Sequence, residues 1–434
     1  MKQYKTFRFI DVVWQESTRS VVMRYGLDDE IIFKDTVVFE FDLSSKFNRE
    51  LLERAMRSLW LVNGVSYYKA ALTPKIDAQA AHLTAAEAEF LSTTYRLGLG
   101  QLCYEHKLPL DRVAVFKPII GAVATPVAAT GLSGSVVGLG GGKDSLVTTT
   151  ILEKMGEEFV TFSATYMPEE NGALAQLAEV IGKPHLVIRR RFDPQLAQLN
   201  RDGAYNGHVP VTAIITLIGL VAAILTGRRQ VIMSNEASAG EGNVEWDGVM
   251  VNHQYSKTLA YERLLSEHIT SSVSPDLQVF SLLRPLGELQ IAKLFAAGPM
   301  QRYQGLYSSC NRNFKADAGA FGWCGECSKC AFVYLILSPF VSKKDLRIVF
   351  GADLLTLPAL QTTFRELFGI SGHKPFECVG EIAECRAAAT QAFKSGDYPE
   401  LADFHVPATD FDMKQWHDHL LPERYEAALK VAFA

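Results

Sequence analysis

The sequence predicts an α/β protein built on a doubly wound parallel sheet, with a β-rich module before the sheet and a helical region after it. Three successive patterns along the chain support this prediction. Residues 1–130 begin with alternating apolar and polar runs, residues 131–335 alternate apolar strands with amphipathic helices, and residues 336–434 have a mainly helical pattern. We take these three ranges as the predicted domains.

The N-terminal module is expected to contain a small antiparallel sheet. Residues 7–14, 20–25 and 36–41 are rich in β-branched and aromatic side chains, and a Gly26-Leu27-Asp28-Asp29 turn lies between the last two runs. Residues 80–106 then carry Ala, Glu and Leu at helical spacing without proline. This region is therefore predicted to be a module separate from the sheet that follows.

The central region supplies the doubly wound sheet. Its apolar runs predict strands at 135–139, 159–164, 185–188 and 230–234. Between them the periodicity predicts helices at 144–155, 173–181 and 211–226. Strands that alternate with helices pair in parallel through right-handed crossovers. Ligands of such sheets lie beyond the carboxyl ends of the strands, so we expect the site in those loops.

Composition limits the classes of function. The chain has 434 residues, of which 48% are hydrophobic and 21% charged, and a net charge of -5. This is the balance of a soluble globular protein, and it suits a small metabolite better than nucleic acid. The first residues lack the apolar core of a signal peptide, so we expect a cytoplasmic protein. The apolar stretch 211–226 is shorter than the roughly 20 residues that span a bilayer, which predicts a buried helix and no membrane insertion.

A glycine-rich loop joins a predicted strand to a predicted helix. The motif Gly140-Gly141-Gly142-Lys143-Asp144-Ser145 lies where backbone N–H groups and the positive end of the helix converge on an anion. Glycines let a phosphate oxygen approach the main chain, Lys143 adds a positive charge and Ser145 adds a hydroxyl donor. The loop is therefore predicted to bind phosphate groups.

The spacing excludes two commoner nucleotide loops. A Walker loop needs glycine at the position of Val137 and Ser or Thr at that of Asp144, and a dinucleotide fingerprint starting at Gly138 needs glycine in place of Lys143. The motif instead resembles the pyrophosphate loop of N-type ATP pyrophosphatases, Ser-Gly-Gly-x-Asp-Ser, with Gly140 replacing the serine. The resemblance implies a fold of the pyrophosphate-loop ATPase type and cleavage of ATP with release of diphosphate. It also implies that Asp144 orients the loop or helps to hold Mg²⁺.

Four of the seven cysteines form a second motif. They have the spacing C-x13-C-x2-C-x2-C and are Cys310, Cys324, Cys327 and Cys330. Such thiolates can surround Zn²⁺ as a tetrahedron, and an iron–sulfur cluster uses the same ligands. A similar cysteine arrangement follows the pyrophosphate-loop domain of the deazaguanine-nitrile synthases. No ligand position is left open for chemistry, so we expect a structural metal site.

Loops after the later strands add candidate ligands for ATP. The acidic loop after 230–234 is a candidate to hold Mg²⁺ or the ribose through Asn235, Glu236, Glu241 and Asp247, with a solvated acidic loop as the alternative for each of them. Arg284, in Arg284-Pro285-Leu286, resembles a segment of several pyrophosphate-loop enzymes and is expected to contact ATP. The basic run 189–191 is a candidate diphosphate or carboxylate site, with a solvated basic rim as the alternative.

Two further segments carry candidate proton-transfer groups. His253 and Lys257 lie in the polar run 252–257. The glycine-bounded loop 372–380 is a candidate active-site lid, with Cys378 or Lys374 as proton donor.

Across nearly its whole length the chain resembles the ATP-dependent UDP-N-acetylmuramoyl-L-alanyl-L-glutamate epimerases of bacterial cell-wall synthesis. Besides the glycine loop, the resemblance rests on Ser234-Asn235-Glu236-Ala237-Ser238, Glu245-Trp246-Asp247-Gly248, Cys310-Asn311-Arg312-Asn313 and His373-Lys374-Pro375-Phe376-Glu377-Cys378. It implies a nucleotide-sugar dipeptide as substrate, recognised by the N-terminal module.

The implied chemistry is adenylation followed by proton exchange. Adenylation removes the negative charge of the terminal glutamate α-carboxylate and so acidifies the Cα proton. A base on one face then removes this proton and an acid on the other returns it. The candidates for this pair are His253, Lys257 and Cys378.

Two other functions are compatible with parts of the sequence. A nitrile- or amide-forming enzyme resembling deazaguanine-nitrile synthase shares the loop and the cysteines, but it leaves the N- and C-terminal additions without a role. A tRNA-thiolating or RNA-binding protein is disfavoured by the acidic charge balance.

Overall fold

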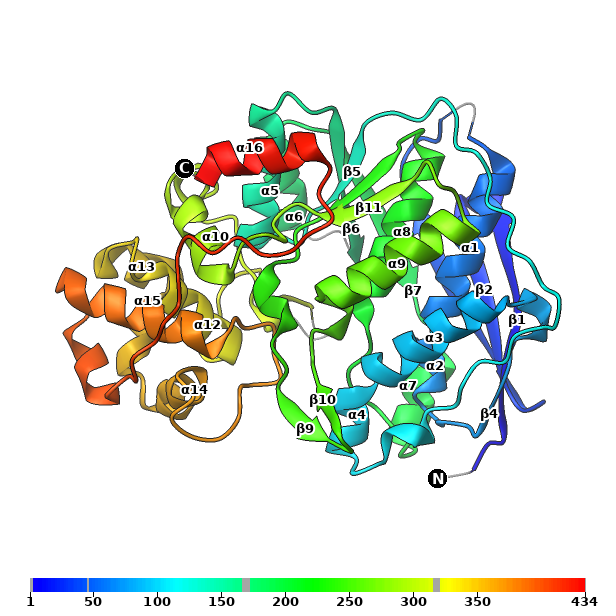
Figure 1. Cartoon of the computed structure of the whole chain (residues 1–434), viewed down its shortest axis with the longest axis horizontal. Coiled ribbons are helices and arrows are strands. Elements are labelled where there is room, and N and C mark those ends of the chain that lie inside the picture. Colours follow the sequence, from blue (N-terminus) through cyan, green and yellow to red (C-terminus); the bar gives the residue numbers. More distant parts are fainter. Residues whose placement is uncertain (1–2, 45–46, 166–171, 315–320, 434) are drawn as a thin grey trace.

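Among the residues that the structure describes, a mixed sheet of nine strands runs through the centre of the protein (Figure 1). The computed structural model describes residues 3–44, 47–165, 172–314 and 321–433. In spatial order the strands are β11 (Gln278–Ser281), β8 (Gln230–Met233), β5 (Ser135–Gly138), β6 (Phe159–Thr165), β7 (His185–Arg191), β3 (Ile31–Phe39), β2 (Ser20–Leu27), β1 (Thr6–Gln15) and β4 (Lys75–Asp77). The strands from β11 to β7 are parallel. The predicted α/β fold with a large, mostly parallel sheet is confirmed.

The N-terminal strands pair antiparallel with one another, as predicted. They extend the parallel sheet, so the expectation of a separate small sheet is wrong. β3 pairs antiparallel with β7. Across this junction the buried guanidinium of Arg190 lies 2.7 Å from Asp35, and Arg189 lies 2.7 Å from Glu40. The run 189–191 thus lies inside a strand, where ion pairs join the two halves of the sheet. This arrangement favours a structural role over the anion site considered for the run.

Helices cover both faces of the sheet, as in a doubly wound fold. Successive strand residues point to opposite faces, so Val136 belongs to one core and Val137 to the other. The first core includes α1 (Arg49–Asn63), α2 (Val65–Tyr68), α3 (Ala85–Gly98), α4 (Gly100–Glu105), α7 (Pro194–Arg201), α8 (Val211–Leu225) and α9 (Leu259–Ser272). The second includes α5 (Lys143–Lys154), α6 (Gly172–Ile181), α10 (Glu288–Ala296) and α11 (Pro299–Arg302).

The apolar stretch considered as a membrane segment forms α8, which packs inside the first core against α1 and the sheet. The prediction of a buried helix is therefore confirmed. Within the described ranges, no helix combines the length and the apolar character that a bilayer crossing needs.

The C-terminal region is helical, as predicted, and packs on the second core. Its helices are α12 (Ser328–Leu337), α13 (Lys343–Phe350), α14 (Gln361–Leu367), α15 (Ile382–Ser395) and α16 (Glu423–Phe433). Figure 1 shows α16, in red, beside α5. There Tyr425 donates its hydroxyl to Gln230 at 2.5 Å and to Glu157 at 2.9 Å. The C-terminal end is thus fastened to the α/β sheet, while the domain boundaries at 130 and 335 stay predictions.

Candidate functional site

The glycine loop connects β5 to α5, as predicted. Gly141 has a φ of +81°, which favours glycine, and its carbonyl accepts a hydrogen bond from the Ser308 N–H at 2.9 Å. A Cβ on Gly142 would lie only 3.0 Å from the Ser309 Cβ. The cysteine-bearing loop thus packs directly on these two glycines. At Gly140 a Cβ would meet nothing within 4 Å, so the serine of the N-type motif would fit there.

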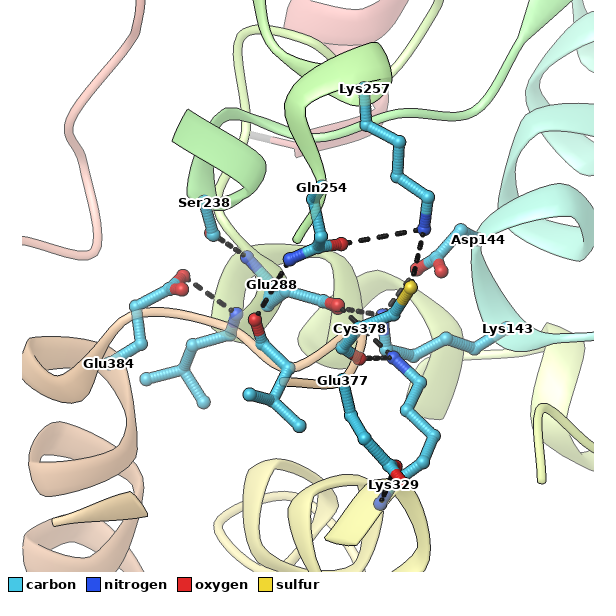
Figure 2. A network of polar contacts seen from close by, with 12 residues as sticks. Lys143, Asp144, Ser238, Gln254, Lys257, Glu288, Lys329, Glu377, Cys378 and Glu384 are labelled. Atoms are coloured by element: carbon cyan, nitrogen blue, oxygen red, sulfur yellow. Dashed lines mark hydrogen bonds and ion pairs between the residues drawn. The ribbon is translucent and has the colours of Figure 1, made fainter. Parts of the chain in front are cut away.

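Lys143, the first residue of α5, forms ion pairs with Asp144 and Glu288 (Figure 2). Its side chain and that of Glu288 are each 2% exposed. Burial lowers the pKa of Lys143, but the two carboxylates outweigh burial and raise it above its ordinary value. The lysine therefore stays charged and neutralises two acids that border the glycine loop. Nearby, the Ser145 hydroxyl donates to the Gly142 carbonyl at 3.0 Å.

Glu236 places a buried carboxyl beside these ion pairs. Only 5% of the residue is exposed. Burial, followed by the charge of Glu288, raises the pKa of Glu236 to about 7, against the opposing effects of Lys257 and Lys143. Its neighbour Asn235 donates a hydrogen bond to Ser281 Oγ at 3.0 Å. Glu236 can therefore exist in both protonation states near neutral pH.

Arg284 connects the loops around this carboxyl. Its guanidinium donates to the main-chain carbonyls of Glu236 and Lys257, both at 2.6 Å, and lies 2.8 Å from the Glu262 carboxylate. The arginine side chain is 1% exposed. These bonds fix the positions of two site-forming loops relative to each other.

Lys257 and Cys378 meet at the centre of the site, although they are far apart in the sequence. Figure 2 shows the lysine ammonium directed at the sulfur, at a distance of 3.2 Å. Burial alone would raise the pKa of the Cys378 thiol, but Lys257, then a hydrogen bond from His253 and the charge of Lys329, lower it to about 6. The pKa of Lys257, despite burial, is raised by Cys378 and Glu236. A thiolate beside an ammonium is thus the stable state at neutral pH.

His253 is another neighbour of this thiol. Its Nδ1 is 2.6 Å from Gln101 Oε1, and its main-chain N–H donates to Asn243 Oδ1 at 2.9 Å. The His208 ring packs against it with centroids 4.1 Å apart. The three predicted proton-transfer residues, His253, Lys257 and Cys378, are therefore brought together, and His208 joins them without having been predicted.

The loop 372–380, predicted to be a lid, lies against the site and is fastened to it. Lys374 pairs with the Glu241 carboxylate at 2.9 Å, and Asn243 donates to the Pro375 carbonyl at 3.0 Å. Lys329 also donates to the carbonyl of Cys378. Glu241 thus serves to hold this loop. Asp247 lies apart, at the turn between β9 (Val244–Trp246) and β10 (Val249–Val251), where it accepts from the Leu110 N–H at 2.8 Å.

The four cysteines of the predicted metal site come together. Their Sγ atoms all lie within 4.8 Å of one another, and three of the separations are 3.5, 3.8 and 3.9 Å. Four Zn–S bonds of about 2.3 Å in a tetrahedron place thiolates about 3.8 Å apart, so the geometry fits one structural Zn²⁺. A four-iron cluster binds each thiolate to a different iron and needs a wider set. Because Ser308 and Ser309 precede Cys310, a bound ion would also fix the loop that supports the glycines.

Comparison with known protein families assigns the chain to one of them. A model described as the MurL N-terminal domain matches residues 1–282, and one described as the MurL C-terminal domain matches residues 306–417. The chain belongs to the MurL family. Between them, these two matches include the glycine loop, the Lys257 loop, the cysteines and Cys378.

Relatives in this family carry the name of one enzyme, UDP-N-acetyl-alpha-D-muramoyl-L-alanyl-L-glutamate epimerase, which is an isomerase. The protein from Xanthomonas oryzae pv. oryzae is 37% identical over 92% of this chain and 88% of its own length. That from Salinispora tropica is 36% identical over 88% and 84%. A third, from a Micromonospora species, is 40% identical over 77% and 73%.

Some residues of the site were not predicted from the sequence, chiefly Glu288, Glu384 and Lys329. The N–H of Leu289, at the start of α10, donates to Glu384 at 3.2 Å, and Lys329 lies 3.6 Å from Glu288. Burial, opposed by a hydrogen bond from Ser238, raises the pKa of Glu384 to about 8. Their sequence signal is weak, because an acidic residue at a helix start usually only caps the helix. Their partners are distant in sequence and become neighbours only in the folded chain.

Proposed function

We propose that this chain is the isomerase that converts the terminal L-Glu of UDP-MurNAc-L-Ala-L-Glu to D-Glu, through an acyl-adenylate made from ATP, with release of AMP and diphosphate. This reaction would belong to peptidoglycan precursor synthesis in the cytoplasm. The observation that carries the proposal is the Cys378 thiol, held at low pKa by Lys257 in the same polar network as the glycine loop. The names of the MurL relatives support it independently.

The ATP end of the site would be the glycine loop, as in the N-type ATP pyrophosphatases. Its N–H groups and the positive end of α5 suit a diphosphate leaving group. The carboxylates of Asp144 and Glu288 would hold Mg²⁺, which neutralises charge on phosphate oxygens. Asn235 would contact the nucleotide, and Arg284 would act by fixing the neighbouring loops.

Adenylation explains why an epimerase would consume ATP. The substrate α-carboxylate attacks the α-phosphorus, the bond to diphosphate breaks, and a mixed anhydride forms. The carbonyl no longer carries a negative charge, so the Cα–H electrons can delocalise into it when the proton leaves. After reprotonation, water cleaves the anhydride to give the D-glutamyl product and AMP.

Proton transfer is assigned to Cys378 and Glu236. The Cys378 thiolate would take the Cα proton and become a thiol, while the protonated Glu236 carboxyl would deliver a proton to the opposite face. Lys257 stays charged because its pKa is raised, so it would stabilise the thiolate and the developing enolate rather than donate a proton. The hydrogen bond from His253 to the sulfur would also favour the thiolate.

Solvent exchange tests this function. With ATP, Mg²⁺ and UDP-MurNAc-L-Ala-L-Glu in deuterated water, the enzyme should place deuterium at the glutamate Cα and form the D-epimer. Cys378→Ser should slow exchange about 10³-fold, within the range of general acid–base contributions, while diphosphate is still released.

Cys103→Ala, which changes a buried thiol in α4, is the matched control and should exchange normally. Products that require added ammonia, without exchange at Cα, would replace the epimerase proposal with the nitrile- or amide-forming alternative. Exchange by Cys378→Ser at the wild-type rate would remove Cys378 from the mechanism.

A further inference from the structure

A buried lysine near the proton-transfer groups has no acidic partner. Lys69 follows α2 and is 9% exposed. Its ammonium donates to the Asn206 side-chain oxygen at 2.7 Å and to the Gly207 carbonyl at 3.0 Å. Both acceptors are neutral, and in the part of the chain that the structure describes no carboxylate forms an ion pair with Lys69. Burial, and then the charge of Arg190, lower its pKa to about 8. A buried charge balanced only by dipoles costs stability unless an anion arrives.

Two histidines, His208 and His253, lie between Lys69 and the reacting thiol of Cys378. His208 follows Gly207, whose carbonyl accepts from Lys69, and its ring packs on His253 with centroids 4.1 Å apart. Burial, then His253, Lys257 and Lys69, lower the pKa of His208 to about 3. Every charged neighbour that acts on His208 is therefore basic. The ring is neutral at physiological pH and can donate one N–H bond.

The arrangement contrasts with two other buried lysines of the site. Lys143 faces Asp144 and Glu288, and Lys374 faces Glu241. In those pairs the protein supplies its own counter-charge. At Lys69 it supplies two neutral oxygens. The difference points to a counter-charge that belongs to a ligand.

We propose that Lys69 and His208 bind the γ-carboxylate of the terminal glutamate, an inference that rests on the proposed function. With the α-carboxylate directed at the glycine loop and Cα at Cys378, the γ-carboxyl carbon lies about 4 Å from Cα when the side chain is extended, from standard bond lengths. The basic side chains extend from Cys378 through His253 and His208 to Lys69. Holding the γ-carboxylate there would leave the α-carboxylate as the group that is adenylated.

Substrate selectivity separates this role from a structural one. Deuterium incorporation at Cα would be measured with UDP-MurNAc-L-Ala-L-Glu and with the analogue that ends in L-Gln, which lacks the γ charge. The wild type should strongly prefer Glu. Lys69→Met should lower kcat/KM for the Glu substrate about 10- to 100-fold, the value of a charged hydrogen bond. It should change the rate with the Gln analogue less than about threefold, and Lys69→Arg should recover much of the preference.

Controls make each outcome decisive. Lys75→Met, which alters an exposed lysine on β4, should leave selectivity unchanged. If Lys69→Met does not fold, judged by its thermal midpoint, His208→Gln is expected to reduce the same Glu over Gln preference. Equal losses with both substrates, or no loss, would overturn the γ-carboxylate site while leaving the epimerase proposal intact. Absence of exchange by the wild type with the Glu substrate would instead refute the proposed function, and this inference with it.

Discussion

The two ends of the site differ in how their charges are balanced. At the glycine-loop end, Lys143 pairs with Asp144 and Glu288, all on the helices α5 and α10. At the Cys378 end, Lys257 and His253 act on one thiol, and Lys69 donates to neutral oxygens. At the first end the protein therefore supplies both the positive and the negative charges. The second contains the buried Lys69 ammonium, which can pair with an anionic group of a substrate.

Because of this difference, substitutions at the two ends should have different effects. Changes at the glycine-loop end and its cysteine support should lower stability as well as ATP use, because buried ion pairs and metal ligands lose their partners. Changes at the Cys378 end should mainly affect protonation and turnover. The predictions below test this division, in order of decreasing effect.

The largest expected effect is loss of the metal site. Cys327→Ser removes one of the four thiolates that lie within 4.8 Å of one another. Because structural Zn²⁺ contributes roughly 10 to 16 kcal/mol in small zinc peptides, we expect bound zinc to fall from one per chain to none and the thermal midpoint to drop sharply. Metal analysis and thermal unfolding check this. Cys103→Ala should keep its zinc, and an unchanged metal content in Cys327→Ser would disprove the assignment.

A smaller loss of stability is expected from the ion pair at the glycine loop. Glu288→Gln removes a carboxylate that is 2% exposed and leaves Lys143 with Asp144 alone. Breaking a buried pair costs about 3–5 kcal/mol of unfolding free energy, which urea unfolding would measure. Glu326→Gln, which breaks a half-exposed pair with Arg312 at 2.8 Å, should cost less than about 1 kcal/mol. Equal effects of the two substitutions would show that Glu288 is not a structural partner of the loop.

The smallest effect is a displacement of the pH profile. The rate should rise with pH as Cys378 loses its proton, near its pKa of about 6, and fall as Glu236 loses its own, near about 7. Lys257→Gln removes the charge that holds the thiolate, so the pKa of Cys378 moves toward its ordinary value of about 8.5. The rising limb of kcat/KM should then shift upward by about 1–2 pH units.

The control is Lys344→Gln, which changes an exposed lysine and should leave the rising limb in place. A rising limb that does not move in Lys257→Gln would exclude Cys378 as the base.

The sequence located the parts of the site whose chemistry depends on local spacing. The run from Gly140 to Ser145 specifies a strand-to-helix loop by its own residues, and the spacing of Cys310 to Cys330 predicted a cluster of four thiols that fits a metal ion. The strands β5, β6, β7 and β8 of the parallel half were also found, because their apolar runs are short and bounded, whereas the edge strand β11 was not predicted. The N-terminal strands were found too, but not the sheet they join, since pairing of β3 with β7 depends on contacts between distant segments.

Local sequence thus determined the elements, the loop and the metal ligands, because periodicity and spacing act within a few residues. Tertiary structure alone decided that Lys257 would meet Cys378, that Glu288 would pair with Lys143, and that Lys69 would be buried beside neutral oxygens. Those outcomes set the charges and pKa values of the site. They depend on burial and on partners far away in the chain, and no single segment of the sequence specifies the burial or the partners.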